Sequence, residues 1–493
     1  MTQNKKTIPK ELLYCFALAV SFLFICSKNS PIYPTNDWPD SSCIFTVGKS
    51  LKHGAVLYRD IFDHKGPILY FIYALAALIS ETSYIGLWLI EIIAMTGFLF
   101  YSWKCVSLFT EYEKYVPVLL PVLALLVFTT NAFSHGGSTE ELCLLPLTYS
   151  LYYFLRILNN KDIKPIEHLL VGGCVGIVFW MKYTIVGMYI GAYFTLLVLV
   201  IIKKDLKGFL NMLKNFGGFL IVTVVVLLYF IANNALIDLW EVYFYGNIFL
   251  YGESAPLASK IIFAISNVAG SSLVNKLLFI PLYLGFLWMI IKKRKESIFC
   301  IASFATAGIF IFFGSAYYYY TLVLATFSFL ALYMGCEILA FVCKEKEQIT
   351  GKKVTLILTT ILCLILSYFL SGNTYLLQYE KEDLPQYKFA KIISTVEDAK
   401  ILNYHFLDGG FYFAADYVPE NKYFYFSNLP APEMAADQNR MIEDQLVDFV
   451  ITRTHKLEEY LITDDYILVA EDTFFIEYGD YNYYLYQKID TIP

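Results

Sequence analysis

Residues 31–67 read PIYPTNDWPDSSCIFTVGKSLKHGAVLYRDIFDHKGP and follow a first apolar segment of the chain. Ionisable side chains gather in this stretch, namely Asp37, Asp40, Arg59, Asp60, Asp63, His64 and Lys65. Charged groups beside a membrane are costly unless water or a partner compensates them, so such a cluster is expected at a functional site. The stretch therefore predicts a polar functional loop in an otherwise apolar chain.

The composition indicates a polytopic α-helical membrane protein. Of the 493 residues, 58% are hydrophobic and 16% are charged, whereas soluble domains contain about 25% charged residues. The mean hydropathy is +0.55. About eleven apolar runs approach the length that a membrane-spanning helix needs. These runs are 12–27, 84–104, 116–133, 142–158, 167–181, 184–202, 216–233, 276–291, 297–315, 321–341 and 354–371. The net charge of −6 and the acidic C-terminal region suggest no nucleic-acid partner.

Basic loops predict the orientation of these runs in the membrane. The loops contain Lys161 and Lys164; Lys203, Lys204, Lys207 and Lys214; Lys292, Lys293, Arg294 and Lys295; and Lys344, Lys346, Lys352 and Lys353. The positive-inside rule places all four, with the N-terminus, on the cytoplasmic side. The apolar run 68–80 is short for a full crossing, so we expect an interfacial or re-entrant helix there. This topology places the C-terminal domain outside the cytoplasmic membrane.

A change of composition after residue 371 predicts two domains. Residues 1–371 form the transmembrane domain, whose first outer loop is 28–83, and residues 372–493 form a small extracytoplasmic α/β domain. Short alternating runs predict strands at 400–407, 422–427, 448–453, 466–471 and 481–487. Two helical patterns, at about 385–398 and 433–446, separate them.

Three basic residues lie on the predicted outer side, where few are expected: Arg59, Lys65 and Lys182. Each could simply pair with a neighbouring acidic residue. Together with an aromatic-lined interface, they suggest capture of an anion whose tail lies in lipid. A polyprenyl phosphate fits this description, because Arg and Lys are the natural partners of phosphate.

Asp37 and Asp40 lie in the stiff segment NDWPDS and could supply a general base. A carboxylate beside a sugar hydroxyl can take its proton while the oxygen attacks an anomeric carbon. The hydroxyl is far less acidic than an Asp side chain of pKa about 3.9, so proton transfer must accompany bond formation. The alternative is turn chemistry and helix capping, since Asp-Ser before the run 43–51 is typical of a helix start.

Other outer segments supply candidate contacts to acceptor or substrate. In 135–141, Glu140 could complete an acceptor site or bind a divalent cation together with Asp40. Equally, Ser138 could cap the following helix, with Glu140 in its first turn. The predicted outer loop 234–275 is rich in aromatics and includes Tyr245 and Asn247. Tyr320 ends a late span and belongs either to an aromatic interface belt or to a binding site.

At these residues the chain resembles the GT-C superfamily of polyprenyl-phosphate-sugar glycosyltransferases. The likeness is to the branch with protein O-mannosyltransferases and lipid A aminoarabinose transferases. The similar features are Asp40, then Lys52-His53-Gly54, then YRDIFDHKGPILYF at 58–71, with Glu140, Lys182 and the late tyrosines. The resemblance implies that Asp40 is the catalytic base, that Lys65 faces the donor phosphate, and that the transfer inverts the sugar.

The chain departs from the family pattern at two places. Ser41 follows Asp40 where the family often has Glu, and Gly66-Pro67 follows the lysine where the family has two prolines; His64 is an extra residue in the motif. These departures leave the sugar and any metal open. Asp60, Asp63 and His64 are accordingly expected as acceptor or substrate contacts.

The resemblance implies an enzyme that acts outside the cytoplasmic membrane, and we expect a bacterial one because no eukaryotic targeting signal is evident in the sequence. Its acceptor would be a cell-envelope polysaccharide, a teichoic acid, a lipid or a protein. A transporter or flippase of lipid-linked sugars is the main alternative, and it should carry ionisable residues near the bilayer midplane. Glu91 is essentially the one acid in the middle of a predicted span, and the other polar groups gather on one outer face. The enzyme hypothesis is therefore favoured.

Overall fold

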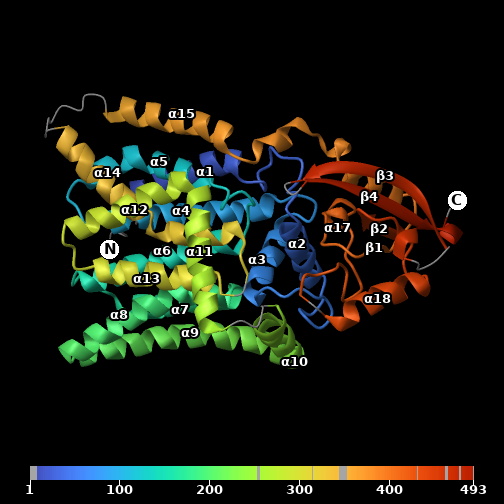
Figure 1. The fold of residues 1–493 in the computed structure, drawn as a ribbon, viewed down its shortest axis with the longest axis horizontal. Coiled ribbons are helices and arrows are strands. Elements are labelled where there is room, and N and C mark those ends of the chain that lie inside the picture. Colours follow the sequence, from blue (N-terminus) through green and yellow to red (C-terminus); the bar gives the residue numbers. More distant parts are fainter. Residues whose placement is uncertain are drawn as a thin grey trace, which may run out of the picture. The chain divides into compact units, whose positions relative to one another are not determined.

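The computed structural model describes residues 8–251, 256–313, 315–343, 352–429, 431–460, 465–476 and 479–491 (Figure 1). Lys344 and Lys346 of the fourth basic loop, and residues 252–255 of the predicted outer loop, lie outside the described residues. The chain divides into two compact units. The first unit comprises Met1–Ser30, Trp88–Val225 and Ala255–Thr374; the second comprises Pro31–Leu87, Val226–Ser254 and Tyr375–Pro493. The predicted boundary at 371 lies close to the start of the last segment of the second unit.

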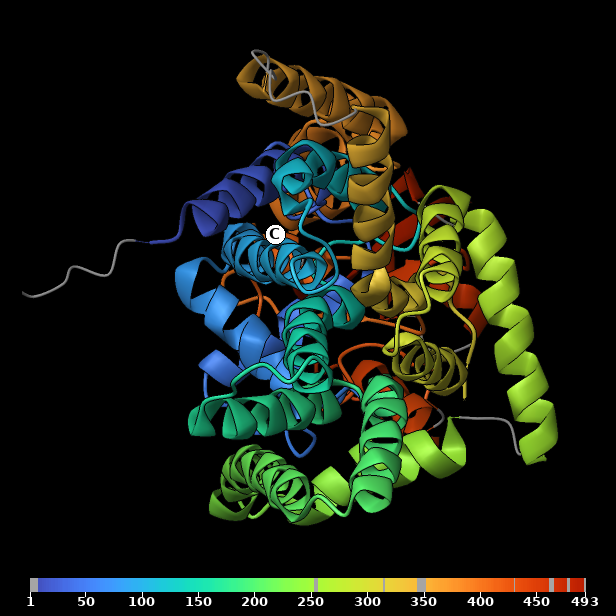
Figure 2. The ribbon, with the colours of Figure 1, turned by 90° about the vertical axis from the view of Figure 1, so that its left-hand side faces the viewer.

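Helices build the first unit. They are α1 (Lys10–Cys26), α4 (Ile85–Val106, which begins in the second unit), α5 (Val116–Phe128), α6 (Thr139–Leu158), α7 (Pro165–Met181), α8 (Gly187–Lys203), α9 (Leu206–Ala232, which ends in the second unit), α11 (Leu257–Val274), α12 (Lys276–Ile291), α13 (Ser297–Ile311), α14 (Phe329–Val342) and α15 (Lys352–Leu370). Helix α8 packs against α13, α12 against α14, and α5 against α15. In Figures 1 and 2, α11 runs across the direction of α12 and α13.

Short 3-10 helices join some of these helices: η1 (Glu113–Tyr115), η2 (Tyr183–Val186) and η4 (Tyr318–Phe327). The predicted span 321–341 is divided between η4 and α14, which are bent by 48° relative to one another. Helix α11 lies within the region predicted as an outer loop. Its polar residues, which include Lys260 and Asn267, dilute the apolar signal in the sequence.

The outer surface of these helices is apolar, as expected of lipid-facing helices. Large side chains such as Ile202, Phe341 and Phe369 are 72%, 85% and 73% exposed. Among the described residues, five helices are long and apolar enough to cross a membrane, and the bent pair would make six. Further apolar helices are shorter, and Pro67–Ile79 is one of them. The predicted number of spans and their orientation stay predictions.

Glycines allow two helices of the first unit to approach closely. A Cβ atom on Gly172 of α7 would lie 1.7 Å from the backbone oxygen of Asn215 in α9. A Cβ atom on Gly218 of α9 would lie 2.0 Å from the backbone oxygen of Leu169. Only a residue without a side chain fits at either position, as is common where helices meet in membranes.

The second unit begins with two helices, α2 (Pro39–Lys52) and α3 (Pro67–Ile79), which pack against one another. Both have proline in the first turn, where its fixed φ and missing N–H are tolerated. The chain returns to this unit through α10 (Leu236–Leu239) and the π-helix η3 (Trp240–Leu250). Its remaining helices are α16 (Pro385–Ile393), α17 (Phe411–Ala414) and α18 (Pro432–Glu443), with the 3-10 helices η5 (Thr374–Gln378), η6 (Lys381–Asp383), η7 (Leu457–Tyr460) and η8 (Ile489–Thr491).

A four-stranded sheet in the order β1-β2-β4-β3 completes this unit. The strands are β1 (Ile401–Asn403), β2 (Phe449–Arg453), β3 (Tyr466–Ile476) and β4 (Gly479–Lys488). Strand β1 pairs with β2 in parallel, whereas β4 is antiparallel to both β2 and β3. Four of the five predicted strands and both predicted helices are confirmed. The strand predicted at 422–427 is wrong, because this segment has no strand pairing and its tyrosine and backbone groups bond elsewhere in the unit.

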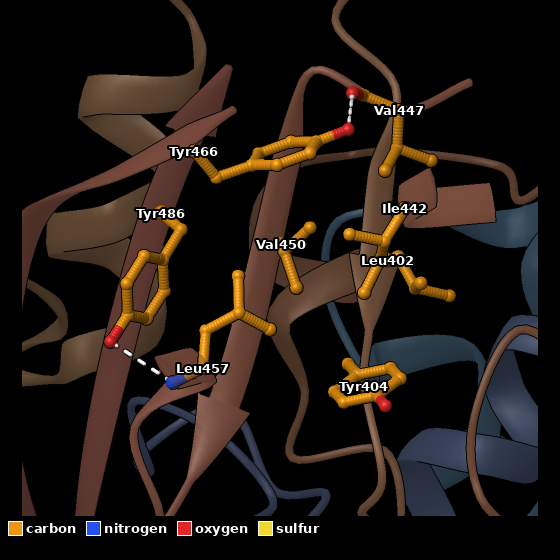
Figure 3. Close-up of a cluster of buried hydrophobic side chains, with 8 residues drawn as sticks. All are labelled: Leu402, Tyr404, Ile442, Val447, Val450, Leu457, Tyr466 and Tyr486. Atoms are coloured by element: carbon orange, nitrogen blue, oxygen red, sulfur yellow. Dashed lines mark hydrogen bonds between the residues drawn. The ribbon is translucent and has the colours of Figure 1, made fainter. Parts of the chain in front are cut away.

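Buried side chains from the sheet, α18, η7 and adjoining connections form the core of the C-terminal segment (Figure 3). They are Leu402, Tyr404, Ile442, Val447, Val450, Leu457, Tyr466 and Tyr486. All three tyrosine hydroxyls in this core have partners. Tyr404 donates to Oδ1 of Asn439 at 2.8 Å, Tyr466 donates to the backbone oxygen of Val447 at 2.7 Å, and Tyr486 accepts from the backbone N–H of Leu457 at 3.1 Å. The polar atoms are thus satisfied while the rings stay buried.

Candidate active site

The starts of α2 and α3 position the two central side chains of the second unit. Asp40 lies in the first turn of α2, directly after Pro39, where a negative charge interacts favourably with the helix dipole. Lys65 directly precedes Gly66, the N-cap of α3. The sequence thus predicts the helix start correctly, and Asp40 lies at it.

Asp40 and Lys65 form an ion pair. The Oδ2 atom of Asp40 lies 3.1 Å from the Nζ atom of Lys65, and each side chain is 22% exposed. Burial disfavours the charged ammonium, but the carboxylates of Asp40 and Asp63 outweigh this effect, so the pKa of Lys65 lies well above its usual value. The pair therefore offers a carboxylate and a firmly charged ammonium that a ligand can still reach.

Tyrosines fix the backbone at Lys65. The Tyr58 hydroxyl donates to the backbone oxygen of Lys65, and the backbone N–H of Lys65 donates to the Tyr70 hydroxyl at 2.9 Å. Tyr58 has a φ of 67°, an uncommon conformation for a residue with a side chain. Its ring stacks on Phe230, with 5.7 Å between the ring centroids. Buried packing thus holds the loop that carries the lysine.

Asp63 is a buried acid beside this pair. Its Oδ1 atom accepts hydrogen bonds from the Tyr425 hydroxyl at 2.8 Å and from the backbone N–H of His64 at 2.7 Å. Burial alone would raise the pKa of Asp63, but Lys65 and then His64 outweigh it, and the pKa lies below its usual value. Asp63 therefore stabilises the charge of Lys65 from within the protein.

His64 joins three separate segments of the second unit. Its Nδ1 atom lies 3.0 Å from Oδ1 of Asn247, and its Nε2 atom lies 3.2 Å from Oδ1 of Asn428. The amide of Asn247 also donates to the backbone oxygen of His64 at 2.7 Å, and Tyr251 packs on the ring at 4.9 Å. Burial lowers the pKa of His64, although Asp63 opposes this shift. The structure therefore brings the predicted residues His64 and Asn247 together.

Arg59 and Asp37 are engaged elsewhere. The guanidinium of Arg59 contacts Asp60 at 2.8 Å and donates to the backbone oxygen of Asn233 at 2.7 Å. This hydrogen bond from Arg59 lowers the pKa of Asp60. The pair is exposed, as the simple pairing alternative expects. Asp37 is buried and accepts a hydrogen bond from Tyr375.

A second acid–base pair lies in the first unit. Lys182 falls in the break between α7 and η2, and its Nζ atom lies 2.7 Å from Oε1 of Glu140. The same ammonium lies 3.2 Å from the centre of the Tyr320 ring, so a cation–π contact adds to the ion pair. Tyr320 is 6% exposed, so it is buried beneath this lysine.

The capping hypothesis for the segment before α6 is confirmed. Ser138 is the N-cap, and its hydroxyl accepts from the backbone N–H of Glu141 at 3.1 Å.

The suggested cation site would need Asp40 and Glu140, which belong to different units and each contact a lysine of their own unit. No group of three or more His, Cys, Asp or Glu among the described residues could hold a metal ion. Tyr245 is 45% exposed and packs against Phe249.

Several contact residues carry no signal in the sequence. Tyr425 comes from the segment predicted as a strand and Asn428 directly follows it, and they reach Asp63 and His64 from far along the chain. Tyr70 lies inside the quoted motif, where its spacing from Lys65 across a helix start could have indicated the contact. In the first unit, Glu91 is fully buried and accepts hydrogen bonds from Ser27 at 2.7 Å and Asn29 at 3.1 Å. The position of Glu91 in the sequence does not indicate these partners. Most of these contacts join segments that are far apart in the sequence, so a local pattern does not indicate them.

No protein-family model and no curated protein sequence matches the chain. Among solved structures, ArnT from Cupriavidus metallidurans bound to undecaprenyl phosphate aligns with a TM-score of 0.65 at 9% identity, over 96% of this chain and 97% of that one. ArnT from the same organism in the apo state aligns with a TM-score of 0.62 at 10% identity, over 96% and 97%. The oligosaccharyltransferase of Archaeoglobus fulgidus, in complex with Zn and sulfate, aligns with a TM-score of 0.43 at 11% identity, over 95% of this chain and 72% of that one. The alignments with ArnT extend over nearly the whole of both chains, and this chain therefore has the fold of ArnT.

Proposed function

We propose that the chain is a membrane glycosyltransferase that moves a sugar from a polyprenyl-phosphate donor to a cell-envelope acceptor, with inversion. The acceptor is a polysaccharide, a teichoic acid, a lipid or a protein, and transfer takes place at the outer face of the cytoplasmic membrane. Asp40 is the general base, and Lys65 binds the donor phosphate. The 3.1 Å contact between these two side chains is the observation that carries the proposal.

The ion pair suits both tasks. An ammonium has three N–H donors, so Lys65 can keep Asp40 as one partner and still donate to a phosphate oxygen. Both side chains are partly exposed, so substrate can reach them. Because Asp63 helps to stabilise the charge of Lys65, the lysine stays cationic while Asp40 takes part in the reaction.

The reaction is a single displacement. Asp40 accepts the proton of the acceptor hydroxyl while its oxygen forms a bond to the anomeric carbon. The bond between that carbon and the phosphate oxygen breaks, and polyprenyl phosphate leaves with the electron pair. Lys65 compensates the charge that develops on the leaving phosphate. Attack from the face opposite the leaving group inverts the anomeric centre.

The start of α3 supports a phosphate beside Lys65. Gly66 is the N-cap and has no side chain that could cap the helix. Pro67 has no N–H and the N–H of Leu69 donates to the backbone oxygen of Gly66 at 3.1 Å, so the N–H of Ile68 and the helix dipole favour an anion at this N-terminus. The apolar exterior of the first unit suits a donor with an isoprenoid tail, and the ArnT structure was determined with undecaprenyl phosphate.

The other predicted residues enter the proposal in two groups. Asp37, Asp60, Asp63, His64 and Asn247 belong to the second unit together with the pair, and the buried Asp63 and His64 position Lys65. Arg59, Lys182, Glu140, Tyr245 and Tyr320 are proposed as additional contacts to donor or acceptor. The C-terminal domain of residues 372–493 is proposed to lie outside the membrane with the catalytic loop.

The test compares the envelope glycans and lipids of cells that carry the wild-type chain, Asp40→Asn or no chain, by mass spectrometry. We expect a sugar modification that requires the chain and is absent with Asp40→Asn, because the amide cannot accept the proton. Equal amounts of each variant in the membrane fraction are verified by immunoblot.

Asp437→Asn is the matched control, because Asp437 also pairs with a basic residue, Arg440, on the surface of the second unit. It should leave the modification intact. A full modification in cells with Asp40→Asn would exclude Asp40 as the base, and identical glycans with and without the chain would exclude the transferase.

A further inference from the structure

A basic cavity lies at the loop between α12 and α13 in the first unit. Its volume is about 440 Å³, and it is lined by Asn159, Lys292, Lys293, Arg294, Lys295, Glu296, Tyr333 and Glu337. Four consecutive cations thus face two carboxylates, so the lining carries a positive excess. None of these residues belongs to the proposed active site.

Two of the basic residues are fixed by protein contacts. Lys292 lies 3.1 Å from Glu337, whose other oxygen accepts from Thr110 at 2.7 Å. Arg294 donates to the Tyr333 hydroxyl at 3.3 Å and to the backbone oxygen of Phe109. These contacts give the cavity a defined wall.

The other two basic residues are exposed. Within the described ranges, neither the hydrogen bonds nor the ion pairs include the side chain of Lys293 or Lys295. Lys293 has a φ of 51°, so the chain turns sharply between the two helices at this residue. Two exposed cations thus lie at a structured cavity, and they favour a ligand that carries negative charge.

Apolar side chains flank the cavity on both helices. Leu287 and Ile291 at the end of α12 are 52% and 59% exposed, and Ile298 at the start of α13 is 74% exposed. Such side chains face lipid in a membrane protein. A ligand that fits here has an anionic head at the cavity and an apolar tail along the helices.

We propose that this cavity binds the phosphate headgroup of an anionic phospholipid, with the acyl chains along α12 and α13. Basic cavities between membrane helices are suited to such headgroups. Lys293 and Lys295 bind the phosphate, and Arg294 and Lys292 shape the wall. Free inorganic phosphate shares the head chemistry but lacks the chains.

The test uses the full-length chain in nanodiscs of phosphatidylcholine. Phosphatidylglycerol is added in steps, and retained lipid is counted by native mass spectrometry while the unfolding temperature is recorded. We expect saturable binding of one phosphatidylglycerol and a higher unfolding temperature. Inorganic phosphate is added in a parallel titration.

The lysine variants separate this site from general attraction to an anionic membrane. Lys293→Gln with Lys295→Gln should weaken phosphatidylglycerol binding at least about tenfold, because each lysine near the headgroups contributes on the order of 1 kcal/mol. The control is Lys203→Gln with Lys204→Gln, which removes the same charge from the exposed end of α8. It should change binding less than about twofold.

Several results would overturn the proposal. Equal losses with both double variants would mean that only membrane charge matters, and unchanged binding with Lys293→Gln and Lys295→Gln would exclude the site. Saturable binding of phosphatidylcholine would exclude headgroup recognition. Inorganic phosphate that binds as tightly as the lipid would assign the cavity to the free ion.

Discussion

The carboxylate of Asp40 lies 3.1 Å from the ammonium of Lys65, and the two residues stand at the starts of the packed helices α2 and α3. This ion pair thus connects the starts of two helices within the polar segment 31–67. Its partial exposure distinguishes it from the buried Asp63 and His64 beside it.

Replacement of Lys65 tests its role toward the donor phosphate. Lys65→Gln should raise the KM for the polyprenyl-phosphate sugar by about 10- to 100-fold, because a hydrogen bond to a charged group contributes ~1.5–3 kcal/mol. The KM for the acceptor should change much less. The measurement is a membrane transfer assay with the sugar that the glycan comparison identifies.

Arg440→Gln is the control for that assay. Its guanidinium pairs with Asp437 at 2.7 Å on the surface of the second unit, so we expect a change in donor KM of less than about threefold. A larger effect on the acceptor than on the donor with Lys65→Gln would contradict the phosphate assignment.

A double-mutant cycle tests the pair in the first unit. Glu140→Gln, Lys182→Gln and the double variant should reveal a coupling of about 0.5–3 kcal/mol in unfolding free energy, because Glu140 is buried and the ammonium also contacts Tyr320. The unfolding of purified protein in detergent provides the measurement. The exposed pair Lys388–Asp472 should give only ~0.2–1 kcal/mol in the same cycle. Strictly additive losses at Glu140 and Lys182 would mean that their contact has no energetic weight.

The sequence predicts the helices of this chain better than their interruptions. The run 84–104 corresponds to Ile85–Val106, because a long apolar run in a membrane has few alternatives to a helix. The break between η4 and α14 carries no such signal, since both halves are apolar and no proline marks the bend. Helix α11 was missed because its lysine, asparagine and serines resemble a surface segment.

The sequence predicts which residues are candidates for the site, but not which of them contact one another. The motif indicated that Asp40 and Lys65 belong to one loop, yet it could not show which carboxylate the lysine contacts. The aromatic alternation of 422–427 predicts a strand that includes Tyr425, and Asn428 lies just beyond it. Their hydrogen bonds to Asp63 and His64 depend on long-range packing, which a local pattern does not contain.

Acid titration should reveal the charge of Asp63. Its pKa is lower in the folded protein than in the unfolded chain, so its stabilisation is present above the usual pKa of about 3.9 and is lost as the pH falls through the folded value. Asp63→Asn keeps an acceptor oxygen for Tyr425 and His64 but has no charge. The unfolding-temperature advantage of wild type over this variant should be constant between pH 7 and 5 and should shrink toward pH 3. An advantage that is the same at pH 3 would exclude an ionised Asp63.

The stabilisation that Asp408 provides should depend on pH in the opposite direction. It is fully buried and accepts hydrogen bonds from Thr46 at 2.8 Å and from the side chain of Asn403 at 3.1 Å. Burial raises its pKa from 3.8 to about 6, so the stability that protonation provides is complete below the unfolded value and is lost as the pH rises through 6. This shift corresponds to ~3 kcal/mol. As the pH falls from 7 to 5, the unfolding temperature of wild type should therefore rise relative to that of Asp408→Asn. The difference in unfolding temperature between wild type and Asp63→Asn should stay constant over this range. If the difference in unfolding temperature between wild type and Asp408→Asn also stayed constant, Asp408 would be ionised throughout this range.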